Sequence, residues 1–266
     1  MENIPVVIVC GGSGTRMGDT MRKKELIDIG GRPLLWHVMR IFSAYNHNRF
    51  ILALGHHGDQ IRRYFLEYEA MTRDTTIFLA PNEDGNDRPH LTVQREHHHA
   101  PWEVSLVDTG LDTEKAARVA RLADYLGNGR FFVAYGEAVA NIDLNALVAF
   151  HDSHGKQATI TGVRFNSQYG KIDADDDGTI SGFIEKPRLP YRINGGFMLF
   201  ENSVLKLIQE RLHDGLELEG EILPYLATQN ELALYRHDGY WQSMKTLKEA
   251  LVLKEAWQKD KPWQVW

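Results

Sequence analysis

A short apolar segment that runs directly into a glycine-rich loop constrains the fold of this 266-residue chain most strongly. Val6 to Cys10 is a continuous apolar run, which is typical of a strand buried inside a parallel sheet. The glycines that follow permit positive φ angles and close approach of a ligand, so their N–H groups can surround phosphate oxygens. This segment therefore predicts an α/β fold with an anion-binding loop at the end of its first strand.

The loop fits neither of the two best-known glycine motifs. The dinucleotide fingerprint needs a third glycine that opens a helix, and the P-loop needs Gly-Lys-Ser/Thr, whereas Gly14 is followed here by Thr15 and Arg16. A tight turn without a ligand is the alternative, because isolated glycine-rich motifs often have no function. The cations Arg16, Lys23 and Lys24 favour a phosphate ligand over that alternative.

Composition and charge favour a small-molecule partner. The chain is 43% hydrophobic and 25% charged, as in ordinary globular proteins, and its formal charge of −6 gives no support for binding nucleic acid or a membrane surface. Cys10 is the single cysteine, so an intramolecular disulfide is excluded. No signal peptide and no run of about 20 apolar residues is evident, which predicts a cytoplasmic protein.

Apolar periodicity predicts alternating strands and helices, an order that produces right-handed βαβ units and a parallel sheet. The first such elements are expected at residues 6–10, 34–42, 50–55, 61–68 and 76–80. Later strands are expected at 104–107, 130–135, 158–164 and 233–235, and later helices at 114–126, 142–154 and 247–257. We expect one domain, residues 1–266, with a Rossmann-like, mixed and mostly parallel sheet flanked by helices.

Two segments imitate metal sites. Residues 97–99 are three histidines, but side chains alternate along a strand, so a solvated loop or edge strand is the better interpretation. Residues 173–178 resemble the start of an EF-hand loop, yet its twelfth position is Ile184, where a bidentate Glu is needed. A β-hairpin turn is therefore predicted there.

The chain resembles the sugar-1-phosphate nucleotidylyltransferases, whose loop reads Gly-Gly-x-Gly-Thr-Arg, then a basic stretch, then Gly-Gly-Lys-Pro. Residues 11–16 and 30–33 match this pattern, and Lys24 stands where the family has a phosphate-binding lysine. The resemblance is strongest to the glucose-1-phosphate cytidylyltransferase branch. Matches to that branch extend over nearly the whole chain, at residues 35–37, 101–104, 106–110, 185–187, 194–197 and 261–263.

This resemblance implies transfer of CMP from CTP to a sugar 1-phosphate or related phosphate, with release of pyrophosphate. The catalytic residues it implies are Arg16, Lys24 and Lys186. The nucleotide-binding residues it implies are Gly11, Gly12, Gly14, Thr15, Arg16, Lys24, Gly110 and Arg118. A sugar-phosphate subregion is expected at about residues 158–245, with Lys171, Glu185, Lys186, Asn194 and Lys245 as its binding residues. A solvated charge pair is the alternative for Glu185 and Lys186.

The expected partners are CTP or another nucleotide and a small phosphorylated substrate. The resemblance also allows a homo-oligomer.

The implied Mg²⁺ site is where the sequence departs from the family. The family holds Mg²⁺ with an Asp in Gly-Asp-Gly and a second Asp in a late Asp-Thr-Leu motif, where this chain has Glu137 and Lys245. An ammonium cannot ligate a cation, which leaves Glu137 as the one predicted metal ligand. We expect Lys245 to form an ion pair with Glu137. Alternative functions are nucleotide or sugar-phosphate binding without turnover, and a different reaction on an activated phosphate.

Other departures concentrate near the same site. The family's Pro-Lys-Pro becomes Lys23-Lys24-Glu25, and its Gly-Gly-Arg becomes Ala116-Ala117-Arg118. Random drift would scatter such changes along the chain. Their concentration indicates an altered ligand or altered chemistry.

Overall fold

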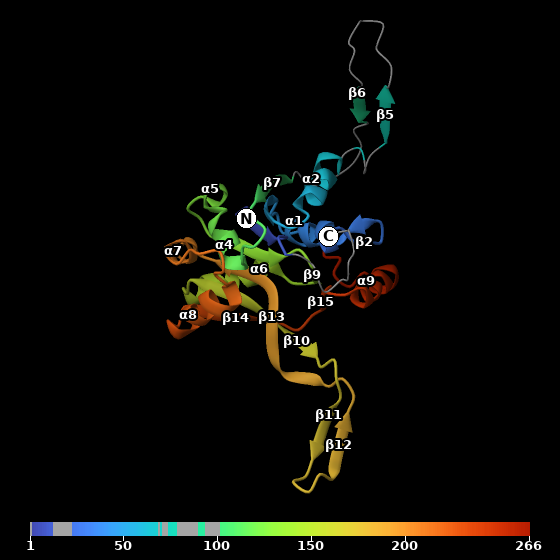
Figure 1. The fold of residues 1–266 in the computed structure, drawn as a ribbon, viewed down its shortest axis with the longest axis vertical. Coiled ribbons are helices and arrows are strands. Elements are labelled where there is room, and N and C mark those ends of the chain that lie inside the picture. The colour runs from blue at the N-terminus through green and yellow to red at the C-terminus, as the bar shows by residue number, and fades with distance from the viewer. Residues whose placement is uncertain (1, 13–22, 69, 71–73, 79–89, 94–101) are drawn as a thin grey trace, which may run out of the picture.

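A seven-stranded sheet runs through the centre of the molecule (Figure 1). The computed structural model describes residues 2–12, 23–68, 70, 74–78, 90–93 and 102–266. Across the sheet the strands are β14 (Leu232–His237), β10 (Ala158–Asn166), β13 (Arg188–Phe200), β8 (Phe131–Tyr135), β1 (Val6–Val9), β4 (Arg49–Leu54) and β7 (Glu103–Asp108). Neighbouring strands are parallel except where β13 pairs with β10 and β8. The predicted Rossmann-like, mixed and mostly parallel sheet is confirmed.

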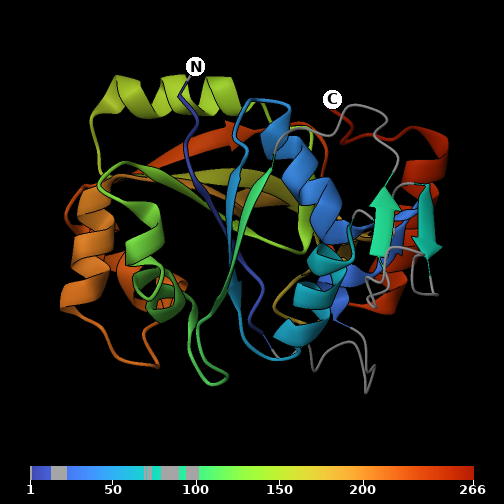
Figure 2. The same cartoon turned by 90° about the horizontal axis from the view of Figure 1, so that it is seen from above.

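The side chains of the inner strands alternate between two cores, one on each face of the sheet. Val6 and Ile8 of β1 pack in one core, whereas Val7 packs in the other. The first core is covered by α1 (Leu34–Ser43), α6 (Leu144–His154) and α9 (Leu247–Lys259), and the second by α4 (Lys115–Ala120), α5 (Ala123–Leu126), α7 (Asn202–Glu210) and α8 (Leu223–Thr228). Figure 2 shows helices on both sides of the strands. Burial on both faces explains the uninterrupted apolar run in β1.

Shorter elements complete the fold. They are η2 (Lys24–Leu26), α2 (Gly58–Leu66), the π-helical turn η3 (Leu218–Ile222), and the antiparallel pairs β2 (Asp28–Ile29) with β3 (Arg32–Pro33) and β9 (Ala138–Ala140) with β15 (Trp241–Ser243). The helix predicted at 114–126 is divided into α4 and α5. Within the described residues, none of the helices combines the length and the apolar composition needed to cross a bilayer.

Two hairpins project from opposite ends of the molecule (Figure 1). One pairs β11 (Lys171–Ala174) with β12 (Ile180–Ile184), so the predicted turn at residues 175–178 is confirmed. The other pairs β5 (Thr75–Phe78) with β6 (His90–Val93). The prediction that residues 76–80 form a third strand of the parallel sheet is wrong, because β7 pairs with all six residues of β4 and occupies that edge. The histidines at 97–99 lie outside the described residues.

The end of the chain packs against α1 through a neutral histidine. The buried Trp263 indole N–H donates to Nδ1 of His37 at 3.3 Å, and Nε2 of His37 lies 2.8 Å from the carbonyl oxygen of Ile29. These contacts suit a neutral ring that carries its hydrogen on Nε2, because protonated Nδ1 would oppose the Trp263 donor. Burial lowers the pKa of His37 to about 4.

We expect His37 to make folding stability depend on acid. Its folded-state pKa lies below the unfolded value near 6.5, so its contribution is complete above pH 6.5 and is lost as the pH falls toward 4. Urea unfolding should show that the free energy of unfolding falls by roughly 2 kcal/mol more between pH 7 and pH 5 in the unmodified protein than in His37→Phe. Equal losses in the two proteins would contradict a buried neutral His37.

Candidate active site

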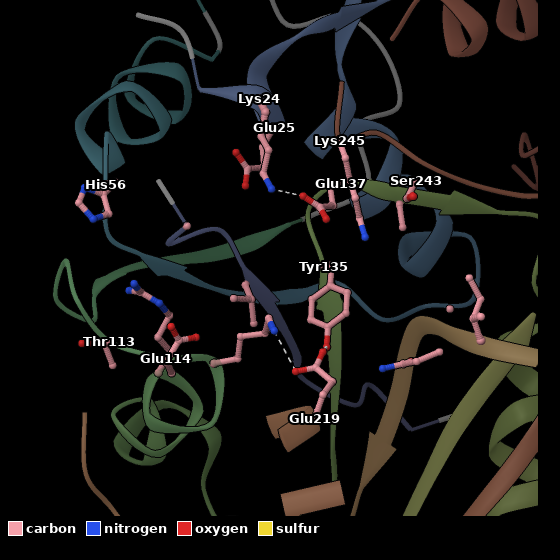
Figure 3. A pocket seen from close by; sticks show the side chains of 18 of the residues that line it. Lys24, Glu25, His56, Thr113, Glu114, Tyr135, Glu137, Glu219, Ser243 and Lys245 are labelled. Atoms are coloured by element: carbon pink, nitrogen blue, oxygen red, sulfur yellow. Dashed lines mark hydrogen bonds and ion pairs between the residues drawn. The ribbon is translucent and has the colours of Figure 1, made fainter. Parts of the chain in front are cut away.

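A pocket of about 750 Å³ opens where β1 and β8 end (Figure 3). Val9 and Tyr135, the last residues of these two strands, line it. Its other walls include η2, the loop after β7, α4, the middle of β13, η3, β9 and β15. Ligands of open α/β sheets bind outside the carboxyl ends of the strands, so the pocket occupies the place where a ligand is expected.

The pocket brings together six of the residues that the sequence indicated. These are Gly12, Lys24, Arg118, Glu137, Asn194 and Lys245. Gly11 and Gly110 lie beside them, since the carbonyl oxygens of both accept hydrogen bonds from Arg118. Gly14, Thr15 and Arg16 lie outside the described residues.

Lys24 forms an ion pair with Glu137 inside this pocket. Both side chains are mostly buried, at 20% and 17% exposure. Burial opposes the charge of Lys24, but the carboxylates of Glu137 and Glu25 outweigh it and raise the pKa of Lys24. The predicted phosphate-binding lysine and the predicted metal ligand are therefore direct partners.

The expected ion pair between Lys245 and Glu137 is not formed. Lys245 lines the pocket near Glu137 (Figure 3), but the ion pair of Glu137 is made with Lys24. Lys24 on η2 is the partner of Glu137, whereas the backbone N–H of Lys245 donates to the side chain of Glu249, at the start of α9, at 2.7 Å. Lys245 thus adds a second positive charge to this end of the pocket.

Glu25 is a buried carboxyl group that the sequence analysis did not assign to the site. It is 2% exposed and lines the pocket, and its Oε2 has no hydrogen-bond partner among the described residues. The nearest ammonium, of Lys23, is 3.9 Å from Oε2 and donates instead to the carbonyl oxygens of Gly12 and His56. Burial raises the pKa of Glu25. The one sequence signal was a charged residue where the family has proline.

Arg118 lines the pocket, and its buried side chain makes five hydrogen bonds to protein acceptors. It donates to the hydroxyl of Thr109 and to the carbonyl oxygens of Leu54, Gly110, Leu111 and Gly11. A Cβ on Gly11 would collide with this guanidinium, which explains the glycine there. Arg118 therefore ties the glycine-rich loop to the loop after β7.

A second polar group at the opposite end of the pocket was not predicted. Glu219, on η3, accepts hydrogen bonds from the hydroxyl of Tyr135 and from the ammonium of Lys115, the latter at 2.9 Å (Figure 3). Burial opposes ionisation of Glu219, but these hydrogen bonds prevail and lower its pKa. Nearby, Asn194 accepts a hydrogen bond from the N–H of Gly196, which fixes its side chain. An ionised carboxylate beside an amide is suited to bind hydroxyl groups.

Lys171, Glu185 and Lys186 do not line the pocket. They lie on or next to the β11–β12 hairpin and are 56%, 62% and 57% exposed. Lys171 pairs with Asp173 at 2.8 Å, and Lys186 pairs with Glu185 at 3.6 Å. Lys186 has a φ of +46°, a left-handed conformation that is uncommon for residues other than glycine.

The model of the nucleotidyl transferase family matches residues 5–251. The chain is 38% identical to the "Probable glucose-1-phosphate cytidylyltransferase" of Bacillus subtilis, over 98% of this chain and 99% of that one. It is 37% identical to the glucose-1-phosphate cytidylyltransferase of Salmonella typhi, over 98% of each. The solved structure of HddC from Yersinia pseudotuberculosis covers 96% of this chain and 99% of its own, with a TM-score of 0.66 at 19% identity, and so supports the fold.

Proposed function

Because this chain belongs to the nucleotidyl transferase family, we propose that it transfers CMP from CTP to a sugar 1-phosphate and releases pyrophosphate. The observation that carries the proposal is the pocket, which joins Gly12, Lys24, Glu137 and Asn194 at the ends of β1 and β8. Similarity to glucose-1-phosphate cytidylyltransferases over nearly the whole chain, at 37–38% identity, favours this transfer over ligand binding alone.

In this reaction an oxygen of the acceptor phosphate attacks the α-phosphorus of CTP. The bond between the α-phosphorus and the oxygen bridging to the β-phosphate breaks, and pyrophosphate leaves. Such a transfer depends on alignment and on compensation of negative charge, so it needs no covalent protein intermediate. Lys24 and the backbone near Gly12 bind the triphosphate, while Asn194 and Glu219 orient the hydroxyl groups of the acceptor.

We assign the acceptor to the part of the pocket built by residues of about 158–245. This part contributes Ile193, Asn194, Gly195, Glu219, Trp241, Ser243 and Lys245 to the lining. The preceding part of the chain contributes Gly12, Lys24 and Glu137, and Glu137 lies near Lys245 (Figure 3). Donor and acceptor would then meet between the two groups of residues.

The pocket can hold Mg²⁺ through carboxylates. Mg²⁺ in phosphate-transferring proteins commonly has one or two carboxylate ligands, with substrate phosphates and water completing the shell. Glu137 lines the pocket, and Glu25 brings an oxygen without a hydrogen-bond partner among the described residues, so this donor set fits. When bound, the ion neutralises charge on the transferring phosphates. Lys24 and Lys245 supply fixed positive charge beside it.

The proposal is tested by measuring pyrophosphate release with each common nucleoside triphosphate and a panel of sugar 1-phosphates. We expect Mg²⁺-dependent release that is fastest with CTP and requires an acceptor. The same mixtures should be examined by calorimetry for binding. If CTP and a sugar phosphate both bind but no pyrophosphate forms, the chain is a binding protein of this fold.

Lys186 is expected to contribute to acceptor binding despite its distance from the pocket lining. Strained backbone conformations concentrate at functional sites, and Lys186 has such a conformation at the base of the hairpin. Lys186→Gln should raise the KM for the sugar 1-phosphate by about tenfold, corresponding to about 1.4 kcal/mol, and leave the KM for CTP unchanged.

Lys171→Gln is the matched control for Lys186→Gln, because Lys171 lies on the same hairpin and is also exposed. Its effect on the acceptor should be smaller, since the ammonium of Lys171 is 2.8 Å from its partner Asp173, whereas that of Lys186 is 3.6 Å from Glu185 and is therefore held less closely. Unchanged acceptor kinetics in Lys186→Gln would show that the pocket residues bind the acceptor without the hairpin.

A further inference from the structure

We propose that Glu25 and Glu137 together bind the divalent cation. Glu25 would serve in place of the family's second carboxylate, at whose position this chain has Lys245. The inference rests on the proposed function, because it concerns the metal that assists this phosphate transfer. In this chain the second metal ligand would therefore come from η2, and not from the loop after β15 as in the family.

The environment of Glu25 points to a missing ligand. A buried carboxylate oxygen without a hydrogen bond is unfavourable, and a bound ion is one reason that such a group persists. Oε2 of Glu25 is in this state within the described part of the chain, and the side chain lines the pocket. Lys23 does not satisfy it, because its ammonium lies 3.9 Å away and donates to two backbone carbonyls.

Glu25 lies beside Glu137 because of the glycine that precedes Glu137. A Cβ on Gly136 would lie 2.9 Å from Cγ of Glu25, so a larger residue there would displace the Glu25 side chain. The side chain of Glu25 therefore packs on the backbone immediately before Glu137. Both carboxylates line the same end of the pocket (Figure 3). They are therefore neighbours in the fold although they are far apart in the sequence.

The ammonium of Lys24 occupies the place that the divalent cation would take. This ammonium is the partner of Glu137, and Figure 3 shows the side chain between the labelled Glu25 and Glu137. A divalent cation bound by the two carboxylates would compete with this ammonium, since both are cations that require the same oxygens. Displaced in this way, the ammonium of Lys24 would be available to the triphosphate. Lys245 repels a cation from the other side of Glu137 and so favours the Glu25 side.

The test is a titration of the full chain with Mn²⁺ alone, with free Mn²⁺ measured by electron paramagnetic resonance. Glu25→Gln and Glu137→Gln should each weaken Mn²⁺ binding about tenfold or more, and Lys24→Met should strengthen it by a similar factor. Glu114→Gln, which removes another carboxylate from the pocket lining, is the control and should leave Mn²⁺ affinity unchanged.

Glu25→Asp is a second variant, needed in case Glu25→Gln does not fold. It keeps a carboxylate, so it should bind Mn²⁺ more tightly than Glu25→Gln. The proposal is overturned if Glu25→Gln binds Mn²⁺ as the unmodified protein does. It is also overturned if neither the unmodified protein nor Lys24→Met binds Mn²⁺ at millimolar concentration. If Mn²⁺ binding contradicts the proposal but the protein still releases pyrophosphate from CTP, the proposed function stands. If the variants change Mn²⁺ affinity as expected but no pyrophosphate is released, only the proposed function is overturned.

Discussion

Replacing Lys24 by methionine is expected to lower kcat/KM for CMP transfer by roughly 10²–10³-fold, the usual effect of removing one preorganised group that stabilises developing charge. Methionine keeps most of the side-chain volume and removes only the ammonium. Lys24 is the described cation that both follows the glycine-rich loop and lines the pocket. The loss should appear in pyrophosphate release, while calorimetry should show weaker CTP binding.

Lys206→Met is the matched control for Lys24→Met. Lys206 is an exposed lysine on α7, so the same substitution there should leave kcat/KM unchanged. Circular dichroism should confirm that both variants are folded. If Lys24→Met retained full activity, Lys24 would serve only as the partner of Glu137, and the assignment of the triphosphate to this side of the pocket would be wrong.

Replacing Arg118 by methionine should reduce the free energy of unfolding by roughly 3 kcal/mol or more, because hydrogen bonds to a charged donor are lost and buried carbonyls become unsatisfied. Arg118 makes five such contacts, and they connect Gly11 with the loop after β7. Gly11, at the start of the glycine-rich motif, should lose this contact, so CTP affinity should fall as well. Urea unfolding and calorimetry measure the two effects.

Two further variants separate geometry from charge at Arg118. Arg118→Lys keeps the charge but not the forked set of donors, so it should recover little of the lost stability. Arg121→Met removes a neighbouring arginine that is 35% exposed and contacts Thr109, Thr113 and Asp214, and its loss should be smaller. A stable Arg118→Met protein with normal CTP affinity would contradict the positioning role.

The central sheet could be predicted because burial on both faces leaves a plain signal. β1, β4 and β8 are apolar along most of their lengths, and the segments between them have helical periodicity or turn residues. The partner of β5 could not be predicted, since a four-residue apolar strand does not specify which edge it joins. In the structure, β7 pairs with the whole of β4 and so occupies the edge at which β5 was expected.

Site residues could be predicted where they belong to a family motif. They could not be predicted where only tertiary packing brings a charged side chain into the pocket. Lys24, Glu137 and Asn194 were indicated by family motifs and do line the pocket. Glu219 carries no local signal, and the only signal for Glu25 is its departure from the family's proline, because a carboxylate in a sequence is most often solvated and its burial depends on distant segments. The partner of Glu137 was predicted incorrectly for the same reason.

The most direct test of the central claim is phosphorus NMR of a mixture of the protein, CTP, Mg²⁺ and glucose 1-phosphate. If this pocket catalyses CMP transfer, the signals of CTP and glucose 1-phosphate decrease together while those of pyrophosphate and a nucleoside diphosphate sugar appear in equal amounts. Persistence of both substrate signals, at concentrations where calorimetry shows that both bind, would contradict the claim that this pocket catalyses CMP transfer.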